Sequence, residues 1–167
     1  MDIPPASTPV VCDMTTATDT PQQRLDAYQD LFGRHLIGRE RTAEGIRFQL
    51  RANPGVEQQV RKLAEREKAC CAFFAFDITT DGDQVIWDCA VSDNDTARAV
   101  LEEYYLLPET AVQNPAELGD HLAAKGLHFT TDPGGTVHQI VHVPSRTSRS
   151  VGGLPPGRPS AIRAGGS

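Results

Sequence analysis

The chain has 167 residues, a formal net charge of −6 and an isoelectric point near 5.3. This acidic balance argues against nucleic acid as the main partner, because a phosphate-binding surface needs clustered lysine and arginine. Hydrophobic residues make up 39% of the sequence, enough for one modest core, and no run approaches the roughly 18 apolar residues of a membrane span. We therefore expect no nucleic-acid partner and no membrane partner, and the sequence leaves homodimerisation open.

The first residues contain neither a basic nor an apolar segment of the kind that a secretory signal has. The expected location is therefore the cytoplasm, where thiols stay reduced. In that compartment the four cysteines are expected to form a metal or redox set, or to act as small buried apolar residues, and not to build a disulfide framework.

The N-terminal part of the chain predicts a mobile segment followed by a helix. Residues 1–19 are rich in proline, threonine and alanine and are expected to be flexible, although residues 10–14 could supply an extra strand. Thr20-Pro21 combines a capping hydroxyl with proline at the first helical position, which is typical of a helix start. Apolar residues then recur at spacings of three and four, and Gly38 is expected to end this helix.

A strand and a second helix are predicted next. Apolar and polar residues alternate over residues 46–51, which is the period of a strand with one buried face. An Asn-Pro pair at residues 53–54 marks the next helix start. The apolar stripe of that helix, continued in steps of three and four, reaches Glu67 and then Cys70 or Cys71. A carboxylate and at least one thiol are therefore expected on the same face of the helix.

A β-hairpin is predicted after this helix, with Asp81-Gly82 as its two loop residues, because type I′ turns favour this dipeptide. In the resulting register Phe74 faces Cys89. Cys89 would then lie at the end of the hairpin where the second helix finishes, close to the two adjacent thiols. A slip of one residue would turn it to the opposite face of the sheet.

The rest of the chain predicts a closing helix and a weaker extension. Residues 92–95 cap a third helix, which Pro108 ends. Residues 20–110 are thus expected to form an α+β domain of order α-β-α-β-β-α, in which helices cover one face of a small antiparallel sheet. Residues 111–143 are expected to add a short helix and a weak hairpin. Residues 144–167 are rich in proline, glycine, serine and arginine and are predicted to be a disordered tail.

The sharpest chemical feature is the adjacent pair Cys70-Cys71. Thiolate is a soft donor that suits Zn(II), Cu(I), Hg(II) and As(III). With Cys89 converging on it, the pair could form a two- or three-thiolate site, which mercury and trivalent arsenic tolerate and structural zinc does not. The leading hypothesis is a cytoplasmic binding protein for a thiophilic metal or metalloid, with Cys70, Cys71 and Cys89 as ligands. Cys12 lies in the loose N-terminal segment and is expected to play no part.

Two other functions stay open. In one, the protein is a thiol-dependent enzyme, redox or organometal-cleaving, in which Cys70 or Cys71 is the nucleophile and Glu67 is the base. A salt bridge from Glu67 to a strand residue such as Arg47 or Arg51 would instead make the carboxylate structural. In the second of these functions, the protein is a structural or interaction module whose cysteines are core residues, since free cysteine is among the most buried residue types.

The motif Glu-x-x-Cys-Cys-x-Phe-Phe-x-Phe, which runs from Glu67 through Cys70 and Cys71 to Phe76, resembles a group of small, mostly uncharacterised actinobacterial proteins. Similar segments occur alone or appended to metal-responsive regulators of the mercury-resistance (MerR) class. The likeness covers residues 12–110 and implies an association with heavy-metal sensing or resistance. The DNA-binding helices of such regulators are absent here, so DNA binding is not implied. The cysteine pair also has a superficial likeness to that of organomercurial lyases, which are larger enzymes.

Overall fold

The computed structural model describes residues 1–144, which form α-helices, one short 3₁₀ helix and strands in two antiparallel sheets. The predicted α+β class is therefore confirmed. The tail predicted over residues 144–167 lies outside the described residues from residue 145 onward. In chain order the elements are β1 (Val11–Asp13), α1 (Pro21–His35), β2 (Leu36–Arg41), β3 (Ile46–Arg51), α2 (Val56–Cys70), β4 (Phe74–Asp81), β5 (Gln84–Val91), α3 (Asp95–Leu106), η1 (Leu107–Glu109), α4 (Pro115–Ala124), β6 (Leu127–Thr131) and β7 (Val137–His142).

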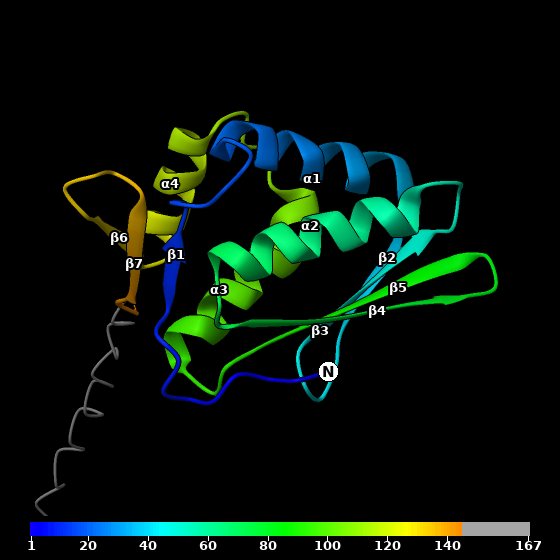
Figure 1. The fold of residues 1–167 in the computed structure, drawn as a ribbon, viewed down its shortest axis with the longest axis horizontal. Helices are drawn as coiled ribbons and strands as arrows, with labels where there is room; N and C mark the ends of the chain where they lie inside the picture. Colours follow the sequence, from blue (N-terminus) through cyan, green and yellow to red (C-terminus); the bar gives the residue numbers. More distant parts are fainter. Residues whose placement is uncertain (145–167) are drawn as a thin grey trace, which may run out of the picture.

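The larger sheet has the strand order β2-β3-β5-β4, and α1 and α2 lie over one of its faces (Figure 1). Trp87 is fully buried on this face, where its ring packs against Phe32 of α1 and Tyr104 of α3. The opposite face is polar and carries an ion pair between Arg47 and Asp88, with 2.7 Å between nitrogen and oxygen. The sheet is thus covered by helices on one face, as its alternating sequence predicts.

Helix α1 begins as predicted but ends early. Thr20 accepts a hydrogen bond from the backbone N–H of Gln23, and the Gln23 side chain accepts one from the backbone N–H of Thr20, which together form a capping box. The helix ends at His35, because the next residue is extended and starts β2. Strand β2 was not predicted, since Gly38 and the charged residues 39–41 hide the alternation of a strand.

The β4–β5 hairpin forms, but the register predicted for it is wrong. Asp81 pairs with Gln84, so the two loop residues are Gly82 and Asp83. Gly82 has a φ of +58°, whereas none of the non-glycine residues in the range 1–144 has a positive φ. Asp81 therefore stays in the strand, and the glycine takes the first loop position, where positive φ is needed.

The corrected register moves Cys89 away from the end of α2. Cys89 faces Phe76 instead of Phe74, and on its other side it pairs with Ile46 of β3. The two-residue shift corresponds to about 7 Å along the strand. Because the shift is even, Cys89 remains on the buried face of the sheet, where it is fully enclosed.

A second sheet, of order β1-β7-β6, lies beside the end of α2. Figure 1 shows β1 between the C-terminal end of α2 and the β6–β7 hairpin. Leu127 and Ile140 of this sheet are buried in the same core as the helices. Residues 11–13 of the segment predicted to be flexible, and residues 111–143 of the predicted extension, thus contribute to one packed body with the domain predicted to close near residue 110.

Candidate functional site

Helix α2 ends at the two adjacent cysteines. Val60 and Leu63 are fully buried, so the apolar stripe of the helix carries its last turn into the core. Cys70 is the last helical residue, and the backbone N–H of Cys71 donates to the carbonyl of Glu67 at 2.7 Å. Both cysteines are buried, with exposed fractions of 8% and 2%.

Strand β1 brings a third cysteine to the end of α2. Cys12 forms a disulfide with Cys71, across a sequence separation of 59 residues and with 4.6 Å between the Cα atoms. The expectations that Cys12 plays no part and that the cysteines form no disulfide are therefore corrected. The cause is long-range, because β1 is held by pairing with β7 near the other end of the described chain, and a three-residue strand carries no local pattern that predicts this partner.

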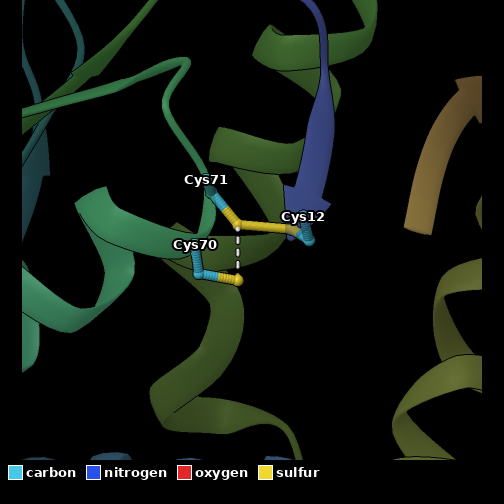
Figure 2. Close-up of side chains that lie close together, drawn as sticks. All are labelled: Cys12, Cys70 and Cys71. Carbon is cyan, nitrogen blue, oxygen red and sulfur yellow. Dashed lines mark hydrogen bonds between the residues drawn. A yellow bond between two sulfur atoms is a disulfide. The ribbon is translucent and has the colours of Figure 1, made fainter. Parts of the chain in front are cut away.

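The three cysteines form a compact sulfur cluster, in which all Sγ atoms lie within 4.8 Å of one another (Figure 2). Sγ of Cys70 lies 3.6 Å from Sγ of Cys71, and the Cys70 thiol donates a hydrogen bond of 3.2 Å to Sδ of Met14. In residues 1–144 no other group of three or more histidine, cysteine or acidic side chains is close enough to hold an ion. Once the disulfide is reduced, Cys12, Cys70 and Cys71 could hold a soft metal ion.

The free thiol of the cluster is protonated at neutral pH. The pKa of Cys70 is raised to about 11, first by burial and then by the negative charge of Glu67, against an opposing effect of Arg24. The thiolate is the nucleophilic and metal-binding form of cysteine. Cys70 is therefore a weak nucleophile in this environment, and an ion that binds it has to displace its proton.

Glu67 lies one helical turn before Cys70 and belongs to an ion-pair network that joins α2 to α1. Its Oε2 accepts hydrogen bonds from the guanidinium of Arg24 at 2.9 Å and from the hydroxyl of Tyr28 at 3.1 Å. Arg24 also pairs with Asp19 at 2.7 Å. The carboxylate is thus paired with an arginine, as one of the predictions has it, but this arginine is on α1 and not on a strand.

Cys89 does not belong to the sulfur cluster. It is fully buried in the hydrophobic core, and burial raises the pKa of its thiol well above the usual range. Cys12 occupies the third position that the sequence predicts for Cys89. The signal that could have identified Cys12 is the extended run Val10-Val11-Cys12, which places a thiol on a short strand.

A pocket of about 190 Å³ opens beside the cluster. Its lining includes Cys70 together with Arg24 and Arg66, whose charges are paired with Asp19. The pocket therefore brings solvent-accessible space next to Cys70.

No protein-family model, curated protein or solved structure matches the chain. The predicted resemblance to small actinobacterial proteins and to segments of MerR-class regulators stays a prediction. Across residues 1–144, no helix is both long and apolar enough to cross a bilayer. The functional assignment therefore rests on the chemistry of the sulfur cluster.

Proposed function

We propose that this protein binds one thiophilic metal or metalloid ion through the thiolates of Cys12, Cys70 and Cys71. The observation that carries the proposal is the convergence of three Sγ atoms to within 4.8 Å, from two elements far apart in sequence. Three thiolates suit Hg(II), As(III) and Cu(I), which accept low coordination numbers, whereas Zn(II) normally takes four ligands. The expected bound ion is therefore Hg(II), As(III) or Cu(I).

The spacing of the sulfur atoms supports this assignment. An ion that lies about 2.3 Å from each sulfur needs sulfur atoms roughly 3.8 to 4.0 Å apart. Sγ of Cys70 already lies 3.6 Å from Sγ of Cys71. Cys12 and Cys71, which are bonded to each other, have to separate, and all three sulfur atoms already lie within 4.8 Å of one another. Opening the disulfide is therefore the main rearrangement that binding requires.

The disulfide and the ion compete for the same sulfur atoms. Reduction by an external dithiol transfers two electrons and two protons to Cys12 and Cys71 and leaves the reductant as its own disulfide. The ion then displaces the thiol protons, including the proton of Cys70. A reducing compartment, such as the cytoplasm predicted from the sequence, keeps such a site open, and oxidising conditions close it.

A structural disulfide is the second candidate, and the bond itself favours it. The Cys12–Cys71 link joins β1 to α2 over a separation of 59 residues, and a disulfide that closes a loop of this length stabilises a fold.

A thiol-dependent enzyme is less favoured. Cys70 is protonated at neutral pH, and Glu67 is already paired with Arg24 instead of being free to accept a proton.

Thermal melts separate the two candidates. Protein kept reduced by a phosphine is heated with and without Hg(II), As(III), Cu(I) or Zn(II). An ion present at about 100 times its Kd adds about 2.7 kcal/mol to the free energy of unfolding, which raises Tm by roughly 5 to 10 °C. Oxidised protein should show no rise with As(III), because two of the three thiolates are then absent.

Matched variants locate the binding site. The triple variant Cys12→Ser/Cys70→Ser/Cys71→Ser should lose the rise in Tm, and Cys89→Ala, which keeps the cluster intact, should retain it. A rise of equal size in the triple variant would place the ion elsewhere. No rise with any ion in the reduced wild-type protein would leave the disulfide as a structural link only.

A further inference from the structure

The cluster contains a fourth sulfur atom. Sδ of Met14 lies 3.2 Å from Sγ of Cys70. Met14 directly follows β1 and lies two residues after Cys12. Because side chains of an extended chain alternate, residues two apart project to the same side. One short segment thus presents both a thiol and a thioether to the end of α2.

Met14 is held in place by its backbone. Its N–H donates to the carbonyl of Thr136 at 2.8 Å, and its carbonyl accepts from the N–H of Ala17 at 3.1 Å. Its half-buried side chain packs against the hydrophobic core. The thioether is therefore positioned beside Cys70 before any ion arrives, which lowers the entropic cost of using it as a ligand.

Building on the proposed thiolate site, we propose that Met14 is a fourth ligand that raises the affinity of the site for Cu(I), and for its analogue Ag(I), relative to As(III) and Zn(II). Thioether sulfur is a soft donor, and soft thiolate and thioether sets favour Cu(I). Three thiolates satisfy As(III), and Zn(II) takes thiolate, imidazole or carboxylate ligands. Met14 thus shifts the relative affinities of ions that all bind thiolates toward Cu(I).

The charges around the cluster favour a neutral fourth ligand. Three thiolates place three negative charges close to Glu67, in a region where Cys70 and Cys71 are buried. A fourth thiolate or a carboxylate would add another negative charge, and burying charge is costly. A thioether completes the coordination of a monovalent ion without adding charge.

Affinity measurements on the reduced full-length chain test this role. Cu(I) affinity is measured by competition with a chromophoric Cu(I) chelator, and As(III) affinity by the shift in Tm. Met14→Leu, which is close in volume and should fold, is expected to weaken Cu(I) binding by about tenfold or more. The same substitution should change the affinity for As(III) by less than about twofold, since As(III) does not use the thioether.

The methionine methyl groups give a direct readout. The sequence has only two methionines, Met1 and Met14, so methyl-labelled protein should give two NMR signals, with Met1 as the internal reference. Ag(I) should shift the signal of Met14 alone, and As(III) should shift neither through coordination. Unchanged Cu(I) affinity in Met14→Leu, with a stationary Met14 signal, would overturn the role of Met14 and leave the thiolate site intact. Failure of the wild-type protein to bind any of Hg(II), Cu(I) and As(III) would overturn both proposals.

Discussion

Cys70 and Cys89 are both buried cysteines, and burial raises the pKa of each thiol. Their surroundings differ. Cys89 lies within the larger sheet, where its cross-strand partners are Ile46 and Phe76. Cys70 lies among sulfur atoms, with the other two cysteines of the cluster within 4.8 Å and a thioether at 3.2 Å.

The difference comes from the architecture of the two places. Cys89 belongs to the inner face of one sheet, which repeats apolar side chains. The cluster lies where the second sheet meets the end of a helix that covers the first, so elements distant in sequence contribute neighbouring side chains. Burial and a raised pKa therefore do not distinguish the candidate site from the core in this molecule, whereas the convergence of donor atoms from separate elements does.

The largest effect is expected from the disulfide, which only the cluster possesses. Reduction, or Cys12→Ser, should lower the free energy of unfolding by about 4 kcal/mol, because the bond links residues separated by 59 positions. Urea unfolding with and without reductant measures this loss. Cys12→Ser should show no further loss on reduction, and a wild-type loss below about 1 kcal/mol would contradict a stabilising link.

Glu67→Gln probes the network beside the cluster. It should lower the free energy of unfolding by about 2 kcal/mol, because it weakens a charged contact to Arg24 in which the side chains are only 10% and 15% exposed. It should also lower the pKa of Cys70, because the negative charge of Glu67 raises it. Urea unfolding measures the first effect, and the pH dependence of Cys70 alkylation measures the second.

The alkylation experiment also separates two roles of Glu67. In oxidised Cys89→Ala protein, Cys70 is the one remaining free thiol of the four cysteines. Faster alkylation after Glu67→Gln is expected if the carboxylate acts through its charge alone. Slower alkylation would instead assign Glu67 the role of a base that accepts the thiol proton.

Matched alanine substitutions compare the two thiol regions directly. Cys89→Ala removes one buried sulfur atom and should lower the free energy of unfolding by about 1 kcal/mol. It should leave the As(III)-induced rise in Tm unchanged. Cys70→Ala should abolish most of that rise. Equal effects of the two substitutions on the response to As(III) would remove the distinction between the regions.

The smallest effect is expected from the titration of buried thiols and tyrosines. It leaves the free energy of unfolding unchanged at neutral pH and lowers it only at alkaline pH. The pKa of Cys70 is raised from 9.0 to about 11, and burial also raises the pKa values of Cys89, Tyr28 and Tyr104. Above pH 9 the folded state therefore binds more protons than the unfolded state. The contribution of these groups to the free energy of unfolding should be fully present below pH 9 and should decline as the pH rises toward 11. Thermal melts across this range check the decline, and a constant Tm up to pH 11 would contradict it.

Local patterns in the sequence were sufficient to predict the main core. The Thr20 cap, the alternation that buries Phe48 on β3, and the hairpin that buries Trp87 are all confirmed. Each depends on residues within a few positions of one another, where capping and periodicity act. The hairpin register needed one further fact, that Gly82 and not Asp81 takes the positive φ.

The third cysteine of the cluster could not be predicted from local patterns. Cys12 meets Cys71 only because β1 pairs with β7, and this pairing joins the two ends of the described chain. The placement of Cys12 and Met14 on one side of the chain could nevertheless be inferred from their spacing, since an extended segment places residues two apart on the same side. Two soft donors at this spacing are a signal that sequence reasoning can use.

X-ray absorption spectroscopy of the reduced protein with one equivalent of As(III) tests the three-thiolate site most directly, because it counts the sulfur atoms bound to the ion. We expect three sulfur neighbours in the wild-type protein, two in Cys12→Ser and three in Cys89→Ala. Two sulfur neighbours in the wild-type protein, with no change in Cys12→Ser, would show that β1 provides no ligand and would contradict the proposed site.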